Sequence, residues 1–142
     1  MSSSLNLVKA FDTVSHMDID SALQRFGVSP DFVELVGDLY SDAKTHFKLE
    51  TGETSEIPMT RGVKQGDPLS PLLFNIAMDP MLEAISTKDS GYKWDTSGNQ
   101  LLALCYADDN GLLTMSPRDR QENLNIVQKF CVDSGMSLNV KK

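Results

Sequence analysis

A pair of aspartates interrupts the most apolar run of this sequence. Asp108-Asp109 and Asn110-Gly111 follow residues 101–107 directly, and a second apolar run begins at Leu112. Two apolar runs that flank a short polar tip predict a β-hairpin. Because a buried strand does not tolerate a bare carboxylate, we expect both aspartates at the tip, where their side chains can converge. Such carboxylates repel unless a cation lies between them, which predicts a Mg²⁺ or Mn²⁺ site; the alternative is a solvated acidic turn.

The first part of the chain is predicted to form one strand and two helices. Leu5 and Leu7 fall on one face of an extended segment, as in a short strand with one buried side. The first helix is expected to end at Gly27, and its apolar residues recur at helical spacing: Ile19, Leu23 and Phe26. Ser29-Pro30 is expected to start the second helix, which carries Phe32, Leu35, Val36 and Leu39.

Hairpins and two longer helices are expected in the remainder. Residues 44–60 alternate as in a hairpin with its turn at residues 51–54, and Pro58 makes the second arm an edge strand. A helix from Pro71 is expected to be kinked or interrupted at Pro80. The last helix is expected over residues 117–134, with Gly135 as its C-terminal cap. This order of elements predicts an α+β fold with helices on one side of a mostly antiparallel sheet.

Length and charge narrow the class of protein. The chain has 142 residues, which predicts one domain over residues 1–142. The 13 Lys and Arg against 20 Asp and Glu give a net charge of −7, which argues against a free-standing module held on nucleic acid by bulk charge. Cys105 and Cys131 form no CxxC pair, so we expect reduced cysteines and an intracellular protein. No apolar run reaches the ~20 residues of a membrane span, and no membrane partner is expected.

Four sequence strings resemble motifs of the reverse transcriptases of non-LTR (LINE-type) retrotransposons, in the order that this family has. Tyr106-Ala107-Asp108-Asp109 resembles the metal-binding motif, and residues 134–142 resemble the segment after the long palm helix. The more specific strings are LVKAFDTVSH at residues 7–16, similar to the first palm motif, and RGVKQGDPLSPLLFN at residues 61–75, similar to the loop-and-helix motif. The resemblance covers essentially the whole chain and implies a polymerase palm.

The resemblance also implies roles for individual residues. Asp108 and Asp109 would hold the catalytic metal ions, Mg²⁺ or Mn²⁺, which activate the primer hydroxyl and stabilise the departing pyrophosphate. Phe11 would be the steric gate under the nucleotide sugar. Gln65 and Gly66 would lie against the incoming nucleotide and the template, and the same motif places Lys64 and Arg61 among the nucleotide- and template-binding residues. The alternatives from the residues themselves are a core position for Phe11 and a solvated charge for Lys64.

The chain departs from the family pattern at two places. Asn6 stands where the family has a metal-binding aspartate, three residues before the Lys9-Ala10-Phe11-Asp12 run. An amide brings no negative charge, and the loss could slow chemistry by on the order of 10²–10⁴. Asp12 does not substitute for it, since acid there is part of the family pattern, and we expect it to cap the next turn. Asn110-Gly111 replaces an apolar residue after the acidic pair and is a preferred two-residue turn, which could move the hairpin tip.

These observations favour a palm fragment of an RNA-directed DNA polymerase that is weak or inactive alone. In the full-length context the partners would be an RNA template, a DNA primer and dNTP. The family places its fingers before the first motif and its thumb after the last, so both are expected to be absent. We therefore expect weak nucleic-acid binding by the isolated chain, and self-association through exposed apolar surface. The alternatives are a non-catalytic, retroelement-derived scaffold or interaction protein, and, more weakly, a relative such as a group II intron maturase.

Overall fold

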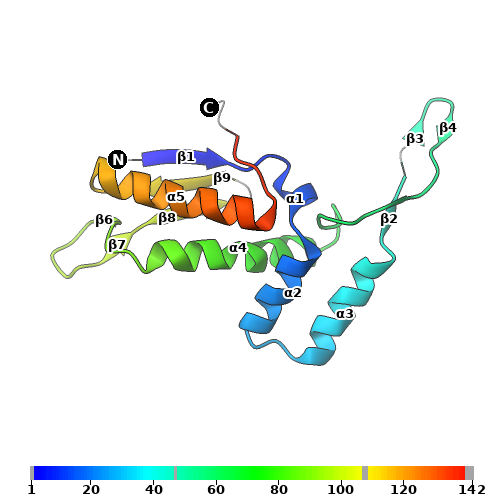
Figure 1. Cartoon of the computed structure of the whole chain (residues 1–142), viewed down its shortest axis with the longest axis horizontal. Coiled ribbons are helices and arrows are strands. Elements are labelled where there is room, and N and C mark those ends of the chain that lie inside the picture. The colour runs from blue at the N-terminus through cyan, green and yellow to red at the C-terminus, as the bar shows by residue number, and fades with distance from the viewer. Residues whose placement is uncertain (1, 47, 107–108, 140–142) are drawn as a thin grey trace.

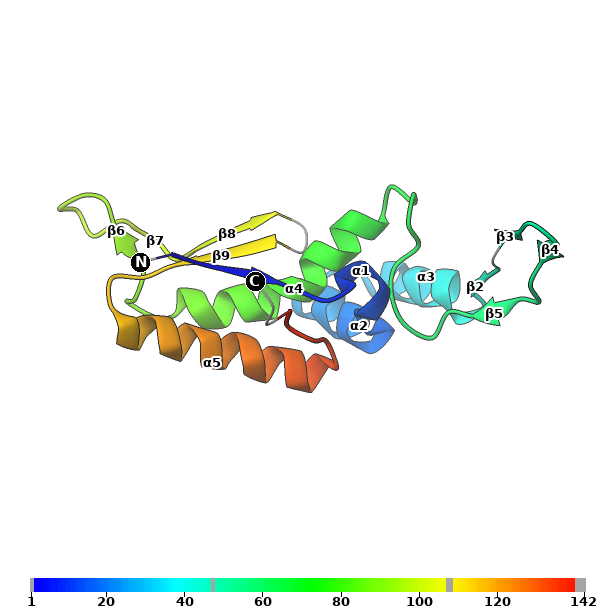
Figure 2. The same cartoon turned by 90° about the horizontal axis from the view of Figure 1, so that it is seen from above.

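A three-stranded antiparallel sheet lies at the centre of the computed structural model, which describes residues 2–46, 48–106 and 109–139. β9 is the middle strand and pairs with β1 from Ser2 opposite Leu113 to Asn6 opposite Asp109. Helices α4 and α5 cover one face of the sheet (Figure 1; Figure 2). The expected arrangement of an antiparallel sheet with helices on one side is confirmed. The bounds of these elements are β1 Ser2–Asn6, β8 Ala103–Tyr106, β9 Asp109–Leu113, α4 Ser70–Ser86 and α5 Pro117–Ser134.

Helix α4 supplies the centre of the hydrophobic core. Leu73 and Phe74 are fully buried, and Ala77, Met81 and Ile85 continue the buried face along the helix. Pro71 lies in the first turn of the helix, where a backbone N–H would have no acceptor within the helix, so proline costs no hydrogen bond there. The helix is not interrupted at Pro80, and Figure 2 shows that its axis bends along its length, as a proline inside a helix produces.

Helix α5 begins and ends where the sequence predicts. The Ser116 side chain accepts a hydrogen bond from the backbone N–H of Asp119 at the N-terminus. Gly135 ends the helix with a φ of 67°, a left-handed conformation that glycine adopts without strain. Val127 and Cys131 are buried against the core. Beyond the helix, Leu138 forms an isolated antiparallel bridge with Leu7 of the first motif.

Helices α1 (Ala10–Thr13), α2 (His16–Arg25) and α3 (Pro30–Ser41) follow β1. Ile19 and Leu23 of α2 are buried as expected, whereas Phe26 is 52% exposed beside the Arg25 guanidinium. The buried face of α3 differs from the expected one. It is made by Val33, Val36 and Tyr40, while the other apolar residues of α3 remain exposed: Phe32, Leu35 and Leu39. The reason is that α3 packs mainly against α2, which fixes the side of α3 that is covered.

A long hairpin projects from the body of the molecule between α3 and α4 (Figure 1). β2 (Lys44–Thr45) pairs with β5 (Ile57–Pro58), and β3 (Lys48–Leu49) pairs with β4 (Gly52–Glu53). The predicted hairpin is confirmed, but its turn lies earlier than residues 51–54. Leu49 is opposite Gly52, which leaves Glu50 and Thr51 as the turn. A two-residue connection fits the strand twist better than a longer one.

The β8–β9 hairpin corrects the expectation for Asn110-Gly111. Both residues lie inside β9, with Asn110 opposite Cys105 and Gly111 opposite Leu104. Asn110 is 5% exposed, so pairing and burial override its preference for a turn. β6 (Tyr92–Lys93) and β7 (Gln100–Leu101) form a further small hairpin. None of the described helices combines the length and the apolar character that crossing a membrane requires.

Candidate functional site

The predicted metal-binding position of the first motif and the acidic position of the hairpin lie opposite each other on adjacent strands. Asn6 ends β1 and Asp109 begins β9, and the strand register makes them direct partners. The Asn6 side-chain Nδ2 donates a hydrogen bond of 3.0 Å to Asp109 Oδ1. Asp108 lies outside the described residues. The structure therefore brings together two of the three predicted metal-site positions, and an amide N–H of one satisfies a carboxylate oxygen of the other.

The described residues do not assemble a complete metal centre. Within residues 2–46, 48–106 and 109–139, no three His, Cys, Asp or Glu side chains gather closely enough to hold an ion. Asp109 and Asn6 offer carboxylate and amide oxygens, which are the hard ligands that Mg²⁺ and Mn²⁺ accept. This pair carries one negative charge, whereas two aspartates would carry two. The donor chemistry thus fits a divalent cation, with a weakened electrostatic attraction.

A strained backbone joins β1 to the helix that carries Phe11. Lys9 precedes α1 with a φ of 48°, in the left-handed region that side chains other than glycine rarely adopt. Such strain persists where surrounding contacts enforce it, and it clusters at functional sites. The turn directs Phe11 onto Phe74 of α4, with ring centroids 4.5 Å apart and an interplanar angle of 18°. Phe11 thus both packs on the core and lines a cavity, so its two predicted roles are compatible.

The loop of the second specific motif docks on α1 through its backbone. The Val63 N–H donates to the Phe11 carbonyl at 2.8 Å, and the Gly62 N–H donates to the Val14 carbonyl at 2.7 Å. A Cβ on Gly62 would lie 2.8 Å from the Asp12 backbone, so only glycine permits this approach. The His16 Nε2 lies 2.8 Å from the Gly62 carbonyl oxygen and fixes the other side of the loop.

A cavity of about 530 Å³ opens where the loop meets α1 and the start of α4. Three predicted nucleotide-binding residues line it together with Phe11: Lys64, Gln65 and Gly66. The Gln65 Nε2 donates to Asp12 Oδ1 at 2.9 Å, which orients the amide at the rim. We expected Asp12 to cap the next turn, but its carboxylate instead accepts the hydrogen bond from Gln65, and Ser15 caps α2. Apart from its chain neighbours, no atom of the described residues lies within 4 Å of a Cβ built on Gly66, so that side of the backbone is open.

Lys64 and Arg61 are both engaged by the protein. The Lys64 Nζ donates to the Leu39 carbonyl at 2.8 Å and lies 5.5 Å from the centre of the Tyr40 ring. Arg61 donates through Nε to the Thr13 carbonyl at 2.8 Å and through Nη2 to the Ser134 carbonyl at 2.5 Å. These contacts tie α1 to the end of α5, and they give Arg61 a structural role. A nucleotide contact by either side chain stays a prediction.

Asp18 lies near Arg61 and is predicted to lower stability at neutral pH. Burial raises the pKa of this carboxyl, and the charge of Arg61 and the backbone N–H of Ser15 offset part of that effect. Its Oδ2 has no hydrogen-bond partner among the described residues. The folded pKa exceeds the unfolded value of about 3.8, so the folded state favours the protonated Asp18 carboxyl. The stability that comes from this protonated form is fully present below pH 3.8. It is lost as the pH rises through the folded pKa.

The substitution Asp18→Asn is therefore expected to raise the melting temperature at pH 7, with a gain that shrinks as the pH falls below about 3.8. Differential scanning calorimetry between pH 3 and 7 measures the effect. The control is Asp20→Asn, which removes the same charge from an exposed position of the same helix. Equal gains for the two variants, or a gain that is independent of pH, would contradict the assignment.

The structure gathers the predicted residues into two groups, the Asn6–Asp109 pair and the cavity around Phe11, Lys64, Gln65 and Gly66. Sequence reasoning missed three supporting residues. Ser70 donates to the Lys64 carbonyl at 2.6 Å, and Tyr40 lies 3.4 Å from the Ser70 hydroxyl and stacks at a tilt on His16. His16 and Ser70 lie inside the two motif strings at residues 7–16 and 61–75, so the resemblance could have identified them as site residues. Tyr40 lies in neither motif, and only the packing of α3 identifies it.

Comparison with known proteins agrees with this arrangement. The sequence matches the family described as reverse transcriptase (RNA-dependent DNA polymerase) over residues 1–142. Two Pol polyproteins from type-1 retrotransposable elements R2 of Popillia japonica are 35% identical over 139 residues and 39% identical over 140. Each match covers 98% of this chain but only 23% and 20% of the relatives, so the chain spans about a fifth of their length.

A solved structure supports the same fold. Telomerase from Candida albicans, in complex with a fragment of telomeric RNA, superimposes with a TM-score of 0.69 over 98% of this chain and 25% of that protein. Its sequence is 15% identical, so the likeness concerns the fold alone. The small antiparallel sheet with helices on one face is that of a polymerase palm. The chain belongs to the reverse transcriptase family, as a region of a LINE-type, non-LTR retrotransposon enzyme.

Proposed function

We propose that this chain is the palm portion of an RNA-directed DNA polymerase, and that it is weak or inactive as a polymerase by itself. The observation that carries the proposal is the pairing of Asn6 with Asp109, where β1 ends and β9 begins. The resemblance implies that metal ions bind at this end of the two strands. In the longer protein, the substrates would be an RNA template, a DNA primer and dNTP, with Mg²⁺ or Mn²⁺ as cofactor. The two ions would stabilise the charge that develops on the phosphate during nucleotidyl transfer.

The residues around the cavity support a role in nucleotide positioning. Phe11 is held by its stack on Phe74, so its ring has little freedom to move away from a sugar placed against it. Asp12 holds Gln65 at 2.9 Å, and the open side of Gly66 leaves room for a ligand next to the backbone. This preorganisation reduces the entropy lost on binding. The carboxylate of Asp109, with Asp108, would supply the ligands for the metal.

The loss of charge at residue 6 supports the inactivity of the isolated chain. An aspartate there would leave two carboxylates facing each other, an arrangement that a bound cation stabilises. Asn6 removes that need, because its amide donates to Asp109 directly. Metal binding must now compete with a hydrogen bond that the folded protein already has. Both effects lower metal affinity and therefore the rate of any metal-assisted step.

The same hydrogen bond favours a second candidate function, a non-catalytic scaffold or interaction protein that retains the palm fold. A satisfied Asn6–Asp109 pair needs no cation for stability, and the net charge of −7 disfavours tight binding to nucleic acid. The two candidates differ in their response to metal. A residual polymerase site gains thermal stability when Mn²⁺ binds, by mass action, whereas a pure scaffold does not.

The substitution Asn6→Asp tests the proposal and is expected to increase Mn²⁺ affinity by about tenfold or more, since it restores the second carboxylate. In EDTA the variant is expected to melt below the wild type, because the two carboxylates then repel. Isothermal titration with Mn²⁺ and thermal melts with and without the metal measure both effects. Primer extension on an RNA template is expected to give trace incorporation by the wild-type chain at most.

The matched control is the double variant N6D/D109N, which moves the carboxylate to the other strand and keeps the charge of the pair. Its Mn²⁺ affinity and its stability in EDTA are expected to equal those of the wild type. A single variant N6D that binds Mn²⁺ no more tightly than the wild type would overturn the metal site. Robust primer extension by the wild-type chain would overturn the proposed inactivity.

A further inference from the structure

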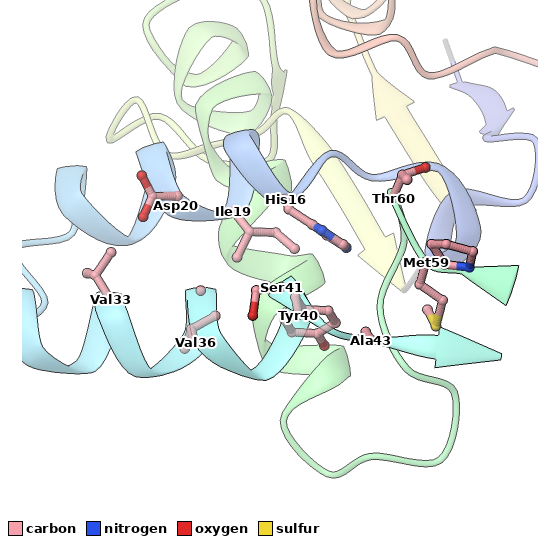
Figure 3. Close-up of a pocket in the computed structure, with 12 residues that line it drawn as sticks. His16, Ile19, Asp20, Val33, Val36, Tyr40, Ser41, Ala43, Met59 and Thr60 are labelled. Carbon is pink, nitrogen blue, oxygen red and sulfur yellow. The ribbon is translucent and has the colours of Figure 1, made fainter. Parts of the chain in front are cut away.

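Helix α3 has two apolar faces, and the protein covers only one of them. Val33, Val36 and Tyr40 are between 4% and 8% exposed. They face α2 across a cavity of about 410 Å³, which Figure 3 shows with Ile19 and His16 on the opposite side. At 100° per residue these three side chains occupy one side of the helix. The contact with α2 therefore buries only some of the apolar side chains of α3.

The second apolar face of α3 points to solvent. Phe32, Leu35 and Leu39 are 37%, 52% and 44% exposed, and their spacing of three and four residues places them in one stripe. Figure 1 shows α3 at the outer edge of the molecule, beside α2. An unpartnered stripe of three large apolar side chains on one helix is typical of a surface that another molecule covers.

An acidic stripe runs beside this apolar stripe. Asp31, Glu34 and Asp38 repeat the spacing of Phe32, Leu35 and Leu39, one residue earlier, and all three are exposed. The helix Pro30–Ser41 contains no lysine or arginine, and none of the salt bridges between described residues involves these acids. We call these six residues the α3 outer surface. It combines an apolar contact area with negative charge that no salt bridge between described residues neutralises.

We propose that the α3 outer surface binds a basic amphipathic helix of a partner protein. Burial of the apolar stripe would supply the driving force, at about 25 cal/mol per Å² of apolar area. Lysine or arginine beside the apolar face of the partner would pair with the acidic stripe and fix its orientation. A second copy of this chain fits poorly, because a symmetric contact would bring Asp31, Glu34 and Asp38 against themselves. Nucleic acid and anionic membranes are repelled by the same charges.

The probe is a synthetic peptide of about 18 residues, long enough for several helical turns, with leucine on one face and lysine on both flanks. A second peptide carries glutamate in place of lysine. Fluorescence anisotropy with the 142-residue chain is expected to show binding of the lysine peptide only. The double variant L35Q/L39Q is expected to lower that affinity by about tenfold or more, as loss of central apolar contacts does.

The triple variant D31N/E34Q/D38N tests the charge separately. It is expected to weaken binding of the lysine peptide by about fivefold at low salt, and to remove the dependence of the affinity on salt concentration. The control is L49Q, which changes a leucine that is 56% exposed on β3, far along the projecting hairpin. This variant should bind like the wild type. Circular dichroism and thermal melts establish that the exposed substitutions leave the fold intact.

Three results would overturn the proposal. The first is equal binding of the lysine and glutamate peptides, which would show that charge does not select the partner. The second is equal binding by the wild type and L35Q/L39Q, which would place the peptide elsewhere. The third is a dimer in analytical ultracentrifugation that L35Q/L39Q abolishes while the peptide does not bind, which would make a second copy the occupant. None of these measurements depends on polymerase or metal-binding activity.

Discussion

Replacement of Gly62 by alanine is expected to destabilise the protein by about 3–4 kcal/mol, near the upper end for a single substitution. Gly62 has a φ of 84°, a region that costs an L-residue roughly 1–2 kcal/mol. The new Cβ would also lie 2.8 Å from the Cα and carbonyl oxygen of Asp12. Since these are backbone atoms, they cannot rotate away. Relief of the clash would stretch the Gly62–Val14 hydrogen bond and the His16 contact.

Gly66 provides a matched control in the same loop. Its φ of 90° resembles that of Gly62, but a Cβ built on it has no contact within 4 Å among the part of the chain that the structure describes, its chain neighbours aside. The substitution Gly66→Ala should therefore show the conformational cost alone, about 1–2 kcal/mol. Urea denaturation of both variants measures the free energies of unfolding. Equal losses for the two variants would show that the close approach of Gly62 to Asp12 contributes nothing to stability.

The loop with these glycines shows what the sequence could predict about the site. The motif strings identified Phe11, Lys64, Gln65 and Gly66, and the structure places all four around one cavity. They could not identify the bond from Gln65 to Asp12, because residues 53 positions apart meet only in the folded chain. For the same reason, the motif strings could not identify the close approach of Gly62 to the Asp12 backbone.

The fold was predictable where local signals and tertiary contacts agree. Helix α5 has a serine at its N-terminal cap, proline in its first turn and glycine after its last residue, and its predicted bounds are confirmed. Asn110-Gly111 carries a strong local turn signal that is wrong here, since the register of β9 between β1 and β8 decides its conformation. Local preferences of about 1 kcal/mol yield to a paired and buried strand.

Helix α3 shows a different limit. Its sequence predicts a helix correctly, but its apolar residues cover two sides, and periodicity alone cannot tell which side packs on α2. The structure buries the side that carries Val33, Val36 and Tyr40, and the Tyr40 hydroxyl lies 3.4 Å from the Ser70 hydroxyl. The excess apolar surface is what the partner proposal explains.

Truncation of Phe74 to alanine is expected to cost about 3–5 kcal/mol, a large part of the 5–15 kcal/mol typical of a whole domain. Phe74 is fully buried in the core, so the substitution leaves a cavity that the neighbouring core residues fill only in part. It also removes the ring on which Phe11 stacks. One residue thus supports both the core and the wall of the candidate nucleotide cavity, and urea denaturation measures the loss.

A double-mutant cycle separates these two contributions. Phe11→Leu and Phe74→Leu retain apolar volume and remove the stacked pair, and the cycle is expected to give a coupling of about 0.5–1.5 kcal/mol. A coupling near zero would mean that Phe74 supports the core without holding Phe11. A coupling in the expected range would mean that the position of Phe11 is set by the hydrophobic core. The cavity at the start of α4 would then owe its shape to folding itself, before any nucleotide binds.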